Sequence, residues 1–259
     1  MNCIFVCVFT QEKYLELFYL LLESITLFGK IKDTHLLVYT NTEFMMKILR
    51  SPFYRDFIHF EINDSYDTID SACRSRLDLF DLPIENYDKI LYLDTDILIK
   101  GDLNQVFDVC KEDVLYVLQE GTIDSDTDFW GKTLFGDEVK NYTDKNAFTS
   151  GVLLFNNCQK IKELFRDIKE DMATRTYSTY FYDQPYIVYH AFKSGLYENK
   201  TLTFMVVNNN EDVENGFIIH HFPGTPGLYS HKMRKMNTFL NQLKTIRSPY
   251  VWENGMVFI

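Results

Sequence analysis

The sequence predicts an α/β protein whose central sheet is mostly parallel and is covered by helices on both faces. Two observations indicate this fold class. Short apolar runs rich in β-branched and aromatic residues, typical of buried strands, recur through the first hundred residues. Helical segments separate these runs, and such alternation is typical of βαβ units. With 259 residues and no linker-like segment, the chain fits one domain with a regular first half and a more irregular second half.

The elements of the first half follow from run length and residue type. Strands are predicted at 3–9, 34–40, 57–62 and 89–94, where runs such as CIFVCVF and KILYLD occur. Helices are predicted at 12–29, 42–51 and 70–80. Gly29 is a natural stop for the first helix, and Asp70 is expected to cap the third.

The second half is less regular. Strands are predicted at 114–119, 148–156, 203–207 and 217–222, and helices at 159–175, 182–195 and 232–246. Pro185 falls early in the helix over 182–195, where a missing N–H is tolerated. The polar, acidic segment 122–147 is expected to run over the surface.

Composition and charge exclude several classes of protein. A formal net charge of −11 argues against whole-molecule attraction to nucleic acid or to an anionic membrane. Five cysteines without a CxxC pair predict free thiols and no disulfide framework. The N-terminus lacks the pattern of a signal peptide, and no segment resembles a membrane span, so we expect a cytoplasmic protein.

The segment LYLDTD places Asp94 and Asp96 directly after a predicted strand. Residues two apart on extended chain point to the same side, and ligands bind at the carboxyl ends of strands in open α/β sheets. Two neighbouring carboxylates repel, and a divalent cation such as Mg²⁺, Ca²⁺ or Mn²⁺ relieves that repulsion. The alternative is a strand-end turn with solvated aspartates.

The segment GFIIHHFPGTPG adds further candidate ligands. His220 and His221 must point to opposite faces of a strand, so one of them is expected to face the core. A histidine added to two carboxylates shifts the preference toward Mn²⁺. The loop that contains Gly224 exposes backbone N–H groups suited to a phosphate, although a tight turn explains it equally.

Two other short motifs carry candidate site residues. Asp183 and Gln184 open a predicted helix, where Asp183 could instead be an N-cap. Ser150 and Gly151 lie at the start of a strand, where the alternative is a bulge or a packing glycine.

The order of these motifs is more specific than any one of them. FTQEKY, the pair Arg76-Leu77 before LYLDTD, FTSGVLLFN, YDQP and HHFPG follow one another along nearly the whole chain. Together they resemble glycosyltransferase family 8, the group with a GT-A fold that includes glycogenin and bacterial galactosyltransferases of lipopolysaccharide synthesis. The resemblance implies a single GT-A domain over 1–259, with a nucleotide-binding half (1–100) and an acceptor-side, metal-completing half (101–259).

The resemblance also implies an activity. The family retains anomeric configuration and moves a sugar from a UDP-sugar, which implies a hexosyltransferase that favours glucose or galactose. The acceptor would be a glycan, a lipid-linked molecule or a protein. The implied cofactor is Mn²⁺, with Mg²⁺ as a substitute.

The resemblance assigns roles residue by residue. The implied metal ligands are Asp94, Asp96 and His221. The implied sugar-binding residues are Ser150, Gly151, Asp183 and Gln184, of which the last two would lie at the reacting face and be catalytic. The implied nucleotide-binding residues are Phe9, Thr10, Gln11, Tyr14, Arg76, Thr95, Gly224 and Lys232.

Three positions depart from the family pattern. Thr149 and Gln11 stand where asparagine is usual, and Gly227 stands where a lysine is usual. Lys232 could take over from that lysine, or it could lie on a solvated helix face.

Other hypotheses stay open at this stage. Tyr177, Tyr180 and Tyr182 could be self-glycosylated as in glycogenin, could stack on an acceptor sugar, or could pack in the core. The chain could also be a non-catalytic relative or, remotely, a haloacid-dehalogenase-like phosphatase. The basic helix over 232–246 could touch a membrane peripherally, although an ordinary surface helix fits as well. A dimer is compatible with the sequence.

Overall fold

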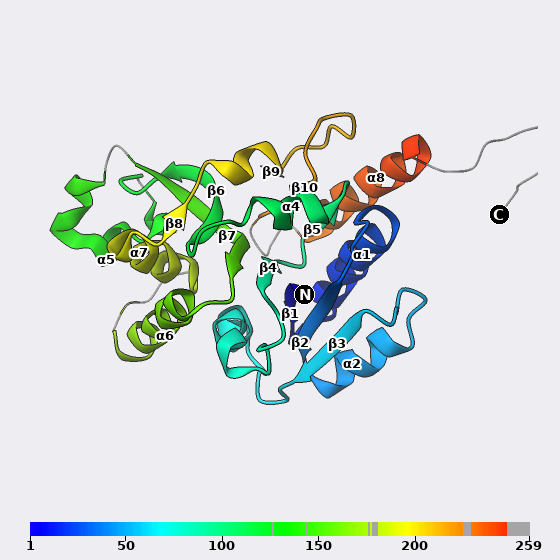
Figure 1. The fold of residues 1–259 in the computed structure, drawn as a ribbon, viewed down its shortest axis with the longest axis horizontal. Helices are drawn as coiled ribbons and strands as arrows, with labels where there is room; N and C mark the ends of the chain where they lie inside the picture. Colours follow the sequence, from blue (N-terminus) through cyan, green and yellow to red (C-terminus); the bar gives the residue numbers. More distant parts are fainter. Residues whose placement is uncertain (126, 143–144, 176, 178–180, 225–228, 248–259) are drawn as a thin grey trace, which may run out of the picture.

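The fold is built around one large twisted sheet. The computed structural model describes residues 1–125, 127–142, 145–175, 177, 181–224 and 229–247 (Figure 1). The seven strands lie in the order β3-β2-β1-β4-β7-β6-β8. Their bounds are β1 (Asn2–Val8), β2 (Thr34–Thr40), β3 (Ile58–Ile62), β4 (Lys89–Leu93), β6 (Leu115–Thr122), β7 (Asn146–Asn156) and β8 (Tyr197–Glu198).

The pairing of these strands confirms a mostly parallel sheet. Strands β3, β2, β1 and β4 are parallel neighbours, as their βαβ connections require. Strand β7 runs antiparallel to both β4 and β6, and β8 is parallel to β6. The carboxyl ends of β1 and β4 therefore meet at one edge of the sheet.

Helices cover both faces of the sheet, as predicted. Residues of α1, α2 and α4 pack in the core on one face, and residues of α6 and α7 pack in the core on the other. In Figure 1 the helices α5, α6 and α7 lie on the left, and α1, α2 and α8 lie on the right. The helices are α1 (Glu12–Phe28), α2 (Thr42–Leu49), α3 (Ile69–Arg74), α4 (Leu103–Val109), α5 (Lys132–Phe135), α6 (Gln159–Thr174), α7 (Gln184–Ser194) and α8 (Tyr229–Arg247). Short 3₁₀ helices are η1 (Ser75–Asp81), η2 (Asp128–Trp130), η3 (Gly136–Asn141) and η4 (Thr201–Phe204).

Strand β1 shows how the sequence produces two cores. Ile4, Val6 and Val8 pack with α1, α2 and α4 on one face. Cys3 and Phe5 alternate with them and pack on the other face with residues of η1, α6 and α7. A strand buried on both sides needs apolar residues at every position, which explains the continuous run CIFVCVF.

A second sheet of three strands carries the late histidines. Strand β10 (Ile219–His221) lies between β5 (Ile97–Ile99), which is antiparallel to it, and β9 (Val206–Asn208), which is parallel. This pairing sets His221 opposite Ile97, next to Asp96 in the sequence. A residue from the far end of the chain is thereby brought to the aspartate pair.

Helix α8 packs its apolar side onto the protein. Met236, Phe239 and Leu240 are buried against residues of α1, β5 and the β10 end. Lys232, Lys235 and Lys244 pair with carboxylates of the body of the protein. Within the residues described, no helix combines the length and apolar character needed to cross a bilayer.

Several predicted elements differ from the structure. Thr68, and not Asp70, caps α3, because its hydroxyl accepts from the Ser71 N–H while the Ser71 hydroxyl accepts from the Thr68 N–H. The helix predicted over 70–80 tightens into η1 after Arg74. The strand predicted over 203–207 begins only at Val206, since η4 occupies its start.

The segment 122–147 is also more than a surface excursion. It folds into η2, α5 and η3, and it buries Trp130, Leu134 and Phe135. Strand β5 was not predicted, because its three apolar residues after LYLDTD are too few to show a strand period. Helix α4 was not predicted either. The five cysteines are free, as predicted.

The buried ring of His220 allows us to predict how the free energy of unfolding depends on pH. Its ring is fully buried against Phe239, and burial lowers the pKa of His220 to about 4. Between pH about 6.5 and about 4 the unfolded chain takes up a proton there that the folded chain does not. The free energy of unfolding should therefore fall as pH falls through this window.

Urea unfolding near pH 7 and near pH 5 checks this for the protein and for His220→Phe. The variant should lose less stability between the two pH values, and the exposed His231→Phe should behave like the parent chain. An equal loss in the parent and His220→Phe would contradict the assignment.

Candidate functional site

A cleft of about 170 Å³ opens where β1 and β4 end. This is the edge of an α/β sheet at which ligands bind. Its wall combines aromatic rings, carboxylates and two cations. The lining residues are Cys7, Phe9, Tyr14, Leu17, Ala72, Cys73, Arg76, Tyr92, Asp94, Thr95, Asp96 and Lys232.

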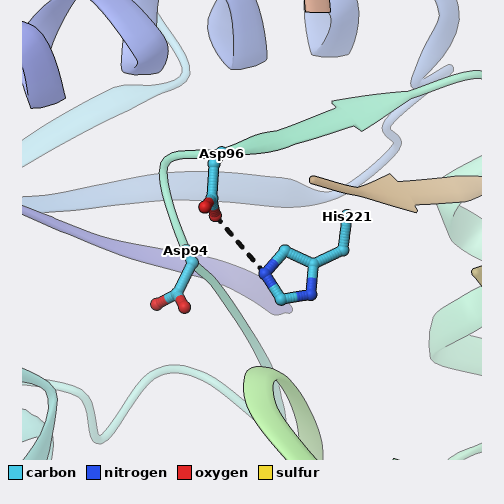
Figure 2. Close-up of side chains that lie close together, drawn as sticks. All are labelled: Asp94, Asp96 and His221. Carbon is cyan, nitrogen blue, oxygen red and sulfur yellow. Dashed lines mark ion pairs between the residues drawn. The ribbon is translucent and has the colours of Figure 1, made fainter. Parts of the chain in front are cut away.

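Asp94, Asp96 and His221 converge beside this cleft (Figure 2). One ligand atom from each lies within 4.8 Å of the other two. His221 Nε2 is 3.4 Å from Asp96 Oδ1. The Phe222 N–H donates to the Asp96 carbonyl at 2.9 Å and continues the pairing of β10 with the chain before β5. The small sheet thus brings His221 to the predicted ligands Asp94 and Asp96.

The donor atoms fit a divalent cation. Asp96 Oδ1 is buried and accepts no hydrogen bond from the described residues, while Oδ2 is paired with the Lys232 ammonium. Burial alone would raise the pKa of Asp96, but the positive charge of Lys232 is the largest opposing cause, and that pKa is held below its usual range. A buried anionic oxygen without a donor is stabilised by a cation, and two oxygens with one imidazole suit Mn²⁺.

Gly151 leaves the space that this group occupies. A Cβ at position 151 would lie 2.5 Å from His221 Cε1, 2.8 Å from His221 Nε2 and 3.0 Å from Asp94 Oδ2. These distances are shorter than side-chain contacts allow, so glycine is required for the histidine and the aspartate to approach. Gly151 is therefore a packing glycine, and the side chains that pack against it are those of His221 and Asp94.

Arg76 joins the ligand group to the rest of the site. Its Nε and Nη2 donate to the two carboxylate oxygens of Asp183 at 2.6 and 2.9 Å. Its Nη1 donates to the Ser150 carbonyl at 2.6 Å and lies 3.5 Å from Asp94 Oδ1. Its guanidinium carbon lies 4.8 Å from the centre of the Tyr92 ring. The planar fork of arginine makes all of these contacts at once.

Asp183 and Gln184 are held by the same network. Asp183 occupies the N-cap position of α7, but its side chain accepts no capping hydrogen bond there. Burial raises the pKa of Asp183, and the Arg76 charge offsets part of that rise. Gln184 Oε1 accepts from the Ser150 N–H at 3.1 Å and lies 3.2 Å from its hydroxyl, while Gln184 Nε2 donates to the Phe129 carbonyl.

Tyr92 is a site residue that the motifs did not single out. Its hydroxyl donates to Asp94 Oδ1 at 2.5 Å and holds that carboxylate at the edge of the cleft. The period of two along β4 could have found it, because Tyr92 and Asp94 point to the same side of an extended chain.

Most of the predicted nucleotide-binding residues meet at the cleft, and three do not line it. Phe9, Tyr14, Arg76, Thr95 and Lys232 line it. Gln11 precedes α1 outside the lining, and the buried Thr10 hydroxyl has no described partner. Gly224 lies in a neighbouring pocket of about 280 Å³ that shares Lys232. Gly227 lies outside the described residues.

Lys232 does not lie on a solvated helix face, since its ammonium group pairs with Asp96 in the cleft wall.

Strained backbone conformations also occur around the cleft. Thr10 (φ 66°), Tyr182 (φ 53°) and Asn209 (φ 51°) adopt left-handed conformations after β1, before Asp183 and after β9. Such positions persist where the surrounding structure over-determines them.

Residues 31–223 match the family model described as glycosyl transferase family 8. The chain belongs to glycosyltransferase family 8. This confirms the resemblance found in the motif order, and it makes the protein a glycosyltransferase by family. No curated protein sequence matches the chain.

Solved structures of glycosyltransferases show the same fold. Mouse xyloside xylosyltransferase 1 superposes with a TM-score of 0.63 at 12% identity, over 87% of this chain and 98% of that one. The galactosyltransferase LgtC gives 0.58 at 14% identity, over 95% and 98%. The bifunctional glycosyltransferase WbbM gives 0.60 at 15% identity over 94% of this chain, which spans about half of WbbM (51%).

These neighbours confirm the predicted GT-A fold. They also exclude the hypothesis of a haloacid-dehalogenase-like phosphatase, because that class of enzyme has a different fold.

Gly151→Ala tests the geometry of the ligand group. The added methyl group must displace His221 or Asp94, so we expect a stability loss of about 1–3 kcal/mol from overpacking. Mn²⁺ affinity, measured by the paramagnetic resonance of the free ion, should fall with it. Gly216→Ala is the control, because a Cβ there meets nothing within 4 Å. A Gly151→Ala protein with unchanged stability and affinity would refute the close approach.

Arg76→Met tests the buried ion pair. It leaves Asp183 charged, 1% exposed and without its donor, which should destabilise the fold by about 3–5 kcal/mol. Arg166→Met removes an exposed arginine that pairs with Asp167 at 2.9 Å, and should leave stability close to that of the parent chain. Chemical denaturation compares the two, and similar losses would contradict the central place of Arg76.

Proposed function

We propose that the protein is a retaining, Mn²⁺-dependent hexosyltransferase that uses a UDP-sugar. Mg²⁺ would serve as a substitute ion, and the acceptor would be a glycan, a lipid-linked molecule or a protein. One observation carries the proposal. In a family 8 chain, two carboxylates and a histidine converge next to the cleft at the strand ends, where the buried Asp96 Oδ1 accepts no hydrogen bond from the described residues.

The cleft suits a nucleoside diphosphate. Phe9 and Tyr14 offer aromatic surface at one part of the wall, and the uracil would stack on Tyr14. Thr10 and Gln11 would hold the base from the end of β1. Lys232 brings a positive charge next to Asp96, and it would meet the diphosphate together with the backbone of Gly224.

Asp94, Asp96 and His221 would hold the cation. When bound, the cation would compensate the negative charge that develops on the leaving diphosphate. Tyr92 and Arg76 keep Asp94 oriented toward the group through contacts with Oδ1. The chain's own contribution is therefore a preorganised set of oxygens and charges.

The sugar would lie against Ser150, Gly151, Asp183 and Gln184. Both oxygens of Asp183 accept from Arg76, and the residue is 1% exposed, which argues against Asp183 as a nucleophile. Gln184 presents an amide carbonyl that would stabilise positive charge at the anomeric carbon. We therefore favour front-face attack, in which an oxygen of the departing diphosphate takes the proton of the acceptor. A glycosyl adduct trapped on Asp183 would contradict this mechanism.

Self-glycosylation is the second candidate. Tyr182 adopts a strained conformation immediately before Asp183 and is half-buried, so its hydroxyl is a candidate acceptor. Tyr177 donates to Asp128 and packs on Tyr186, which favours a structural role, and Tyr180 lies outside the described residues. Intact mass after incubation with UDP-glucose and Mn²⁺ distinguishes the two functions.

UDP release from UDP-glucose, UDP-galactose and UDP-N-acetylglucosamine tests the proposal. We expect release with Mn²⁺ and strong loss after chelation, because Asp94 and Asp96 then repel an anionic substrate. Asp96→Asn should lower turnover by at least about tenfold, since it removes one ionised ligand. Asp102→Asn is the control, as Asp102 caps α4 away from the cleft. Binding of UDP-sugars without any turnover would instead support a non-catalytic relative.

A further inference from the structure

Asn208 and Glu120, which lie outside the motifs named above, form a chain of contacts on one side of the His221 ring. His221 Nδ1 lies 2.9 Å from Asn208 Oδ1, on the side of the ring opposite the ligand group. Asn208 Nδ2 in turn donates to Glu120 Oε2 at 2.8 Å. The chain of contacts crosses from β10 to β9 and on to β6, and so links the small sheet to the large one.

The chemistry of Glu120 decides which way the Asn208 amide faces. A carboxylate only accepts hydrogen bonds, so the NH₂ of Asn208 must face Glu120. The amide oxygen then faces His221, where it also only accepts. The opposite orientation would place a carbonyl oxygen against a carboxylate and leave both without a donor, which is unfavourable in a partly buried site.

The amide orientation in turn fixes the histidine. Because Asn208 Oδ1 accepts, His221 Nδ1 must carry a hydrogen atom. A neutral ring then has its free electron pair on Nε2, the nitrogen that lies 3.4 Å from Asp96 Oδ1. Only a nitrogen with a free electron pair can bind a cation.

We propose that Glu120 and Asn208 are positioning residues that place the hydrogen of His221 on Nδ1 and aim Nε2 at the cation site. The inference rests on the proposed function, because it concerns the same site.

His220, the preceding residue, has a different environment. Its Nδ1 faces the Asn210 carbonyl, but its Nε2 is buried without a described partner, and His220 belongs to no group of candidate metal ligands within the described residues.

The state of Nδ1 is measured in the metal-free protein. Long-range ¹H–¹⁵N correlation on ¹⁵N-histidine-labelled protein reports which ring nitrogens carry hydrogen, and His221→Gln assigns the His221 signals. We expect Nδ1 of His221 to carry hydrogen. An Nδ1 without hydrogen would overturn the proposal whatever the enzyme does with sugars.

Metal affinity is measured separately from activity, by Mn²⁺ paramagnetic resonance. Asn208→Leu should weaken Mn²⁺ binding by about 10–100-fold. Asn146→Leu is the control, because its exposed amide in the large sheet donates to Gln119 at 3.1 Å and contacts no described histidine. Asn208→Leu that binds Mn²⁺ as tightly as the parent chain would overturn the proposal.

A double variant separates hydrogen-bond polarity from folding. In Glu120→Gln with Asn208→Asp, the new amide at position 120 donates to the new carboxylate at 208, which still accepts from His221 Nδ1–H. This variant should recover most of the affinity that Asn208→Leu loses, and failure to recover while thermal unfolding stays normal would overturn the inference. A parent chain that binds no Mn²⁺ would refute the proposed cofactor, while the Nδ1 measurement still decides the tautomer.

Discussion

The buried guanidinium of Arg76 is the interaction on which the site depends. It reaches from η1 to the Asp183 carboxylate at the start of α7, to the Ser150 carbonyl in β7 and toward Asp94 after β4. A charge buried this deeply is tolerated only when its partners are present and well oriented, because desolvation otherwise exceeds the attraction. Three segments far apart in the sequence are therefore held in one arrangement by a single side chain.

The same constraint bears on how an acidic chain would hold the anionic ligand proposed above. The net charge of −11 repels anions at long range, yet the cleft sets Arg76 and Lys232 against its carboxylates. Asp96 already has one oxygen paired with Lys232, and its other oxygen accepts no hydrogen bond from the residues that the structure describes. Local charge, and not the whole-molecule field, decides what this cleft accepts.

The small sheet supplies a residue of the candidate site that the large sheet does not. The large sheet brings Asp94 to its edge, but His221, the third proposed ligand, comes from β10, which pairs with β5 immediately after Asp96. The Asn208 contact to Glu120 ties this small sheet back to β6. Gly151 in β7 then leaves the room in which His221 and Asp94 meet. The site exists where the two sheets are joined.

The sequence by itself determined the α/β class, the two-sided sheet and the candidate residues, because strand and helix periods and the order of short motifs are local properties. It also determined that His220 and His221 must face apart. It did not determine the cap at Thr68, the start of β9 or the folded middle of 122–147, where local signals were weak or competed. Only the tertiary structure decided that Asp183 pairs with Arg76 and that Asn208 supports His221. Those contacts join residues 107 and 13 positions apart through hydrogen bonds whose geometry no periodicity encodes.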